Sequence, residues 1–148
     1  MSLHSYSKCW LHLIWGTLNR EAFLTSESMQ KKVANYLYEY CSQKKIYMKK
    51  NYVNSEHVHA LIDMPTSFSI EEVMHLLKGS SSRWINENGI CPFKFSWGRG
   101  YAALSVSQSG LIRVVEYING QKEHHRKKSF AEEYEEFITK YGMKYVAE

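Results

Sequence analysis

The sequence contains few of the residues that interrupt or cross-link a chain. Only two of its 148 residues are proline, and no internal repeat or Gly/Ser-rich linker divides it. We therefore expect a single domain over residues 1–148. The three cysteines, Cys9, Cys41 and Cys91, are widely spaced and form no CxxC pair, which argues against a disulfide framework and a thiolate zinc site. Reduced, buried thiols are expected instead.

Long apolar runs are also missing. The longest, residues 9–15, is far shorter than the ~20 residues of a membrane span and includes His12. The first ten residues, MSLHSYSKCW, lack the basic and then apolar regions of a secretory signal. These absences predict a cytoplasmic protein with no membrane partner.

Charge of one sign is only slightly in excess. The net charge is +4, a mild bias towards polyanions. Residues 1–128 hold 17 basic and 10 acidic side chains, a net +7, whereas residues 129–148 hold 2 basic and 5 acidic side chains, a net −3. If the partner is a nucleic acid, the first 128 residues are the part expected to hold it.

Hydrophobic periodicity and helix-capping residues divide the chain into strands and helices. The expected strands are residues 6–18, two strands within 46–64, and residues 101–107. The expected helices are residues 27–43, 70–86, one from Ser107 or Ser109 to about Arg126, and 130–141. This order, β-α-β-β-α-β followed by helices, predicts an α+β, ferredoxin-like (split βαβ) antiparallel sheet with two helices on one face. The other face of the sheet is left for a C-terminal helix.

His57 and His59 are the strongest local signal for chemistry, because they stand on a predicted strand. Residues two apart on a strand point to the same face, so both imidazoles project together while Val58 projects into the opposite layer. Imidazole is a common ligand of divalent metals, and the pair predicts a metal site. The alternative is a pair of polar histidines on a half-exposed strand.

Tyr117 and Gln121 are the second signal, because residues four apart share one face of a helix. A tyrosine can attack phosphorus once a metal or base activates its phenol, whose ordinary pKa is near ~10. With His57 and His59, the Gln121 oxygen would complete a three-ligand site with open positions, which suits Mg²⁺ or Mn²⁺. Taken alone, Tyr117 is better explained as a packing aromatic.

Five segments carry a family resemblance that covers nearly the whole chain. They are residues 6–20 (YSKCWLHLIWGTLNR), 57–59 (HVH), 78–86 (KGSSSRWIN), 95–107 (FSWGRGYAALSVS) and 117–134 (YINGQKEHHRKKSFAEEY). Through them the chain resembles the HUH single-tyrosine transposases of small bacterial insertion sequences, a group that includes the REP-associated tyrosine transposases.

The resemblance implies a role for each residue of the two signals. His57 and His59 would be paired metal ligands, Gln121 the third ligand and Tyr117 the nucleophile. The implied activity is DNA transposition: hairpin-bearing single-stranded DNA is bound, cleaved and rejoined through a 5′-phosphotyrosine intermediate, assisted by Mg²⁺ or Mn²⁺. The resemblance also implies a homodimer, in which the tyrosine helix of one subunit can complete the site of the other.

Basic side chains form two clusters that would contact phosphate if the partner is DNA, and that are otherwise ordinary solvated faces. The expected DNA contacts are Lys49, Lys50, Arg83, Arg99, Arg126 and Lys127.

The sequence indicates no catalytic role for the remaining histidines and acids. His124 and His125 are expected to cap a helix end or to touch phosphate. His4, His12 and His75 are expected to be structural, and the acidic run Glu132, Glu133, Glu135 and Glu136 to be a solvated helix face.

Two other functions stay open. A non-cleaving DNA- or RNA-binding module on the same fold would not require histidines, tyrosine and glutamine in this pattern. A small metal-dependent hydrolase would use His57 and His59 with water as the nucleophile, and would leave no covalent adduct on DNA.

Overall fold

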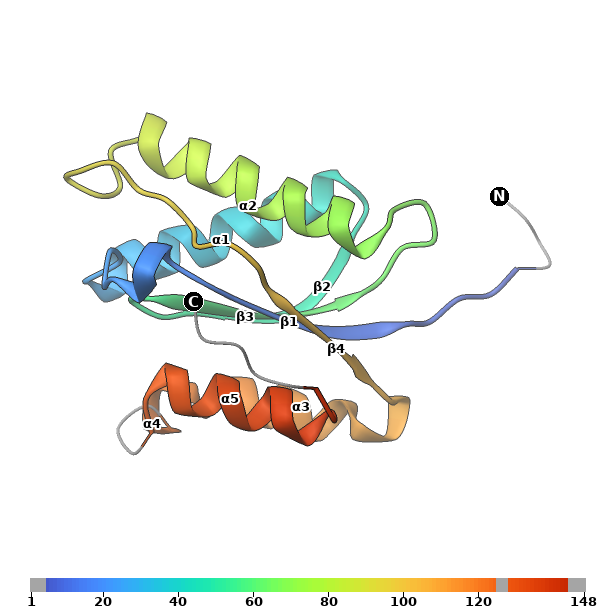
Figure 1. Cartoon of the computed structure of the whole chain (residues 1–148). Helices are drawn as coiled ribbons and strands as arrows, with labels where there is room; N and C mark the ends of the chain where they lie inside the picture. The colour runs from blue at the N-terminus through green and yellow to red at the C-terminus, as the bar shows by residue number, and fades with distance from the viewer. Residues whose placement is uncertain (1–4, 125–127, 144–148) are drawn as a thin grey trace.

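A four-stranded antiparallel sheet separates two layers of helices (Figure 1). The computed structural model describes residues 5–124 and 128–143. The strands are β1 (Trp10–Gly16), β2 (Tyr47–Val53), β3 (His57–Asp63) and β4 (Ala102–Val106). The helices are α1 (Glu27–Gln43), α2 (Ile70–Glu87), α3 (Leu111–Asn119), α4 (Gln121–His124) and α5 (Phe130–Lys140), with 3-10 turns η1 (Leu18–Arg20) and η2 (Gln108–Gly110).

The strand order β2-β3-β1-β4 confirms the ferredoxin-like plan. All three pairings are antiparallel, and β1 and β3 are the two central strands. In the β1–β3 pairing, Gly16 lies opposite His57 and Ile14 lies opposite His59. The histidine pair therefore stands on a strand with neighbours on both sides, where backbone hydrogen bonds hold its register.

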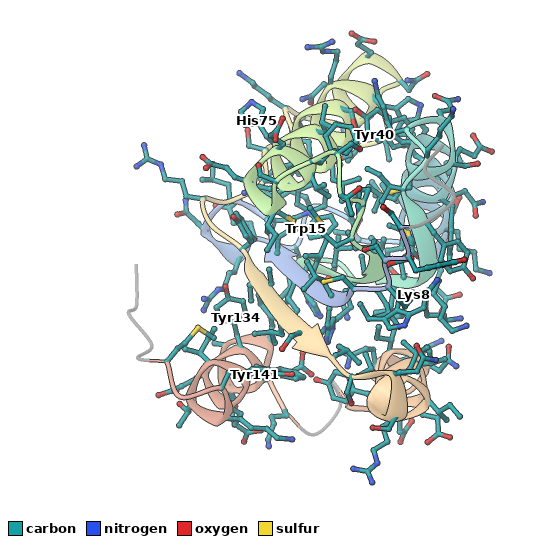
Figure 2. All side chains as sticks on the ribbon, turned by 90° about the vertical axis from the view of Figure 1, so that its right-hand side faces the viewer. Lys8, Trp15, Tyr40, His75, Tyr134 and Tyr141 are labelled. Carbon is teal, nitrogen blue, oxygen red and sulfur yellow. The ribbon has the colours of Figure 1, made fainter. Side chains whose placement is uncertain are left out.

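The two faces of the sheet are covered by different helices. Helices α1 and α2 cover one face, and α3 and α5 lie across the other (Figure 1). Side chains fill the space on both sides (Figure 2): Trp15 belongs to the core under α1 and α2, whereas Tyr134 belongs to the cluster under α5. Alternation along the strands places Val58 with Trp15, so His57 and His59 face α3 and α5.

Serine caps begin α1, α2 and α5, as the sequence predicts, whereas Ser107 caps the 3-10 turn η2 and α3 itself has no side-chain cap. The Ser26 hydroxyl accepts from the Met29 backbone N–H at 3.2 Å, which starts α1. Ser69 and Glu72 form a reciprocal capping box at the start of α2. Among residues 5–124 and 128–143, none of the helices has the length and apolar composition needed to cross a membrane.

Two predicted elements are shorter than expected. The first strand begins at Trp10 because both neighbouring strands end there: Trp10 pairs with Asp63 of β3 and with Val106 of β4. The predicted helix that would reach Arg126 is interrupted at Gly120, where α3 ends and α4 begins. The cysteine prediction is also corrected, since Cys41 and Cys91 are buried but Cys9 is exposed.

Candidate functional site

The two histidines of β3 lie in the layer between the sheet and the helices α3 and α5. Their side chains are completely buried, and their ring centroids are 5.1 Å apart. The Phe130 ring of α5 stacks on His57 with centroids 4.1 Å apart and planes 12° from parallel. A Cβ at Gly16 would lie 3.2 Å from this ring, so glycine opposite His57 leaves room for the stack. The prediction that both imidazoles share one face is confirmed.

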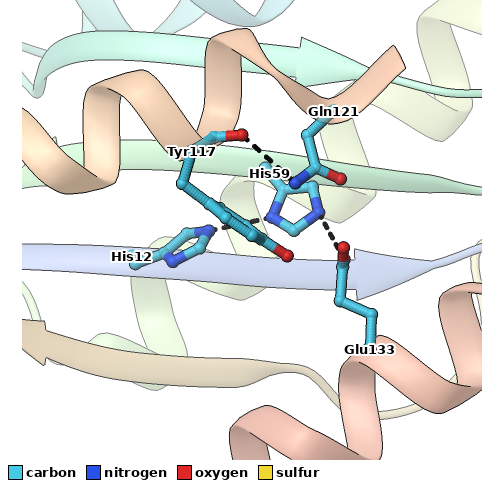
Figure 3. Close-up of polar contacts among 5 residues, drawn as sticks. All are labelled: His12, His59, Tyr117, Gln121 and Glu133. Atoms are coloured by element: carbon cyan, nitrogen blue, oxygen red, sulfur yellow. Dashed lines mark hydrogen bonds and ion pairs between the residues drawn. The ribbon is translucent and has the colours of Figure 1, made fainter. Parts of the chain in front are cut away.

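Both ring nitrogens of His59 have polar neighbours (Figure 3). Nδ1 lies 2.9 Å from Nε2 of His12 on β1, and Nε2 lies 3.1 Å from a carboxylate oxygen of Glu133 on α5. Burial, reinforced by His59, lowers the pKa of His12 to about 3, although the Glu133 charge acts in the other direction. His12 is therefore a neutral imidazole, with one nitrogen to donate and one to accept.

Tyr117 reaches the same layer from α3. Its ring centroid is 5.8 Å from that of His59 and 5.3 Å from that of Phe137 on α5. Burial raises the pKa of the Tyr117 phenol well above its ordinary value. The nearby Glu133 carboxylate raises this pKa further, while the Gln121 amide acts in the opposite direction. The phenol is thus protonated in this structure, and an attack on phosphorus requires its activation.

Gln121 is the first residue of α4 and is fully buried. Its side-chain N–H donates to the Tyr117 backbone carbonyl at 3.3 Å, across the interruption at Gly120. The two residues therefore keep the one-turn relationship that the sequence predicts, although they belong to different helices. Figure 3 shows both beside His59.

Glu133 is a residue of this layer whose position the acidic run of the sequence does not indicate. Its side chain is only 2% exposed, so the prediction that the whole acidic run is solvated is wrong at this position and correct at Glu132, Glu135 and Glu136. The signal was present in the helical period: Glu133 follows Phe130 by three residues and precedes Phe137 by four, on the apolar side of α5. A carboxylate on an apolar stripe is unusual and calls for a partner.

His12 is the second residue whose role the sequence does not indicate. The sequence predicts a structural histidine, and in the structure its side chain is 2% exposed and contacts His59. Since His12 and His59 stand 47 positions apart, no local pattern relates them. The antiparallel pairing of β1 with β3 brings them together.

The donor set of this layer fits a divalent metal ion. One ligand atom from each of His57, His59 and Glu133 can be chosen so that all three lie within 4.8 Å of one another. Imidazole nitrogens, a carboxylate and the amide oxygen of Gln121 offer no thiolate, a set that suits Mg²⁺ or Mn²⁺ better than structural zinc.

The predicted DNA contacts come from separate parts of the fold. Lys49 and Lys50 lie on the edge strand β2, Arg83 on α2 and Arg99 in the loop before β4. Arg126 and Lys127 lie outside the described residues, as do His4, His125 and the side chain of His124.

Arg99, one of the predicted DNA contacts, lies next to a residue that is hydrogen-bonded to the end of β1 beside His57. It follows Gly98, whose N–H donates to the Gly16 carbonyl at 2.8 Å, at the end of β1 opposite His57. A Cβ at position 98 would lie 2.9 Å from the Thr17 carbonyl oxygen, so this close approach requires glycine.

Comparisons of sequence agree with this architecture. The profile of the family described as "Transposase IS200 like" matches residues 5–121. The chain is also 26% identical over 125 residues to the transposase for insertion sequence element IS200 of Salmonella typhimurium strain LT2, with 81% of each chain covered. The same values hold for the IS200 transposase of Salmonella typhi.

Two solved structures share the fold. A proposed transposase of Deinococcus radiodurans R1 superposes with a TM-score of 0.63 at 24% identity, covering 82% of this chain and 96% of that one. A REP-associated tyrosine transposase bound to a REP hairpin superposes with a TM-score of 0.58 at 14% identity, covering 84% and 74% respectively. At these identities the likeness concerns the fold alone.

Proposed function

The chain belongs to the IS200-like transposase family, and from that premise we propose that it cleaves and rejoins hairpin-bearing single-stranded DNA through a 5′-phosphotyrosine on Tyr117, in the cytoplasm. One observation carries the proposal: the partly buried Tyr117 and the buried Gln121, His57 and His59 lie in one layer, although they come from three elements. A packing aromatic does not require an amide and two imidazoles around it.

The chemistry assigned to Tyr117 conserves phosphodiester bonds. Its Oη attacks phosphorus, an Oη–P bond forms as the P–O3′ bond breaks, and the phenol proton ends on the released 3′-hydroxyl. A 3′-hydroxyl of another strand reverses the step and restores the phenol. Since one phosphodiester is exchanged for another, no nucleotide cofactor is needed.

His57, His59 and Gln121 would hold a divalent cation, Mg²⁺ or Mn²⁺. When bound, the cation withdraws charge from a phosphate oxygen and stabilises the developing alkoxide. The role of His12 is to orient His59 through their 2.9 Å contact. The DNA partner is supported by the family, and a hairpin is suggested by the fold neighbour that is bound to one.

The test is a covalent-adduct assay. Wild-type protein, incubated with labelled hairpin-bearing single-stranded DNA and Mn²⁺, should give a protein–DNA band stable to denaturing electrophoresis. Tyr117→Phe should lose the adduct and the nick completely while hairpin binding is kept. The control is Tyr38→Phe, another partly buried tyrosine whose pKa is raised by burial but which lies on α1, and it should react like wild type.

Each alternative gives a different result. An adduct with Tyr117→Phe would contradict the nucleophile assignment. Binding without cleavage by the wild type would support the non-cleaving module, and cleavage without an adduct would support a hydrolase that uses water.

A further inference from the structure

Glu133 is placed at the centre of the site by a helix that lies outside the segment matched by the family profile. The profile ends at residue 121, whereas α5 begins at Phe130. From α5 the carboxylate reaches Nε2 of His59 at 3.1 Å and approaches a ring nitrogen of His57 within 4.8 Å. Its charge also contributes to the raised pKa of the Tyr117 phenol. Glu133 thus lies beside both histidines and acts electrostatically on the tyrosine.

We propose that Glu133 is a ligand of the cation held by His57 and His59, so that α5 supplies part of the metal site. The inference rests on the proposed function and adds a carboxylate to the set of His57, His59 and Gln121. Two neutral imidazoles and an amide carry no charge, so Glu133 would be the one anionic protein ligand of this set. Charge count is a main determinant of affinity for hard divalent cations.

The distances suit ligation. Ligand atoms about 2.1 Å from an octahedrally coordinated ion lie roughly 3 Å from their neighbours. The 3.1 Å between Nε2 of His59 and Oε1 of Glu133 has this length. Because the carboxylate is 2% exposed, water cannot compensate its charge, and a cation beside it would.

His12 completes the arrangement as a positioning residue. For His59 to offer Nε2 to a cation, its proton must lie on Nδ1, which then donates to Nε2 of His12 at 2.9 Å. Metal-binding histidines commonly have such an acceptor behind them. The contact pattern of His59 is therefore that of a ligand, with an acceptor on one nitrogen and a carboxylate beside the other.

The packing of α5 holds Glu133 in place independently of any ion. Ser129 caps the helix by accepting from the Glu132 backbone N–H at 3.2 Å. Phe130, one turn before Glu133, is 3% exposed and stacks on His57. Because aromatic packing anchors the helix, a glutamine at position 133 should preserve the fold.

The proposal is tested by Mn²⁺ binding to the purified full chain, measured by calorimetry and by the Mn²⁺-induced rise in melting temperature. Glu133→Gln should bind Mn²⁺ at least about tenfold more weakly than wild type and show a smaller rise. Glu135→Gln, which removes the same charge from an exposed position of the same helix, should match wild type. His57→Ala should lose binding as a positive control.

The outcomes separate this inference from the proposed function. Unchanged Mn²⁺ affinity in Glu133→Gln, with or without a lower melting temperature of the metal-free protein, would overturn the ligand role and leave the Tyr117 chemistry standing. If Tyr117→Phe still forms the adduct but Mn²⁺ affinity depends on Glu133, the ligand role of Glu133 stands and the proposed Tyr117 chemistry does not. If Glu133→Gln does not fold, Glu133→Asp decides, since a carboxylate shortened by one methylene should also weaken binding.

Discussion

At the scale of single residues, burial favours the neutral form of His12, of Tyr117 and of the core thiols. It lowers the pKa of His12 and raises that of Tyr117, because in both cases the charged form is the one that loses hydration. The same effect raises the pKa of the Cys41 thiol to about 12 and raises that of Cys91. The proposed nucleophile, Tyr117, is therefore a protonated phenol, and the core thiols are protonated and unreactive.

The cysteines give a prediction at this scale. At pH 8 only about one Cys41 thiol in 10⁴ is ionised, and thiol reagents attack the thiolate. Ellman's reagent should therefore release one equivalent of chromophore rapidly, from the exposed Cys9, and the other two only after denaturant is added. Cys9→Ser should remove the rapid phase. Three thiols reacting at one rate in native protein would contradict the burial of Cys41 and Cys91.

At the scale of elements, α5 acts as a cover over the histidine face. Its apolar side, Phe130, Tyr134, Phe137 and Ile138, packs beside Ile14 and Leu104 of the sheet. Helix α3 covers the neighbouring part through Leu111 and Ile118. The histidines lie where these two clusters meet, which explains their complete burial.

Removing the anchor of α5 tests this packing. Phe130→Ala should lower the free energy of unfolding by roughly 3–5 kcal/mol, because a buried aromatic ring and its stack on His57 are lost. Ile112→Ala removes an apolar side chain that is 72% exposed on α3 and should change stability by no more than about 0.5 kcal/mol. Urea denaturation followed by circular dichroism measures both. Equal stability of the two variants would mean that Phe130 does not anchor α5 on the sheet.

At the scale of the whole molecule, the sheet separates the larger apolar core from the candidate site. Its α1/α2 side carries the larger apolar core, whereas its α3/α5 side carries the polar site. Tyr117 contacts His12 and His59 of its own chain, with ring centroids 6.2 and 5.8 Å away. If these contacts persist in the homodimer that the family resemblance implies, each subunit uses its own Tyr117.

A mixing experiment tests this at the same scale. Tyr117→Phe and His59→Ala, co-expressed so that mixed dimers form, should stay without adduct, because each chain then holds one defective site. Wild type co-expressed with Tyr117→Phe should keep activity in proportion to its wild-type chains. Recovery of adduct formation in the first mixture would show that Tyr117 serves the partner's histidines.

Much of the architecture follows from local patterns. The serine caps, the period of two along β3 and the one-turn spacing of Tyr117 and Gln121 are properties of neighbouring residues, and their predictions are confirmed by the structure. The start of β1 at Trp10 was not predictable, because it depends on where strands about 50 to 100 positions away finish.

The sequence by itself determined the order of elements, the shared face of His57 and His59, and the family. Only the tertiary structure decided that His12 and Glu133 flank His59, since they stand 47 and 74 positions away from it. The physical reason is that burial depends on long-range packing. The local pattern predicts that all four glutamates in the run are solvated. Packing of α5 on the sheet excludes water from one of them, Glu133, and places it beside His59.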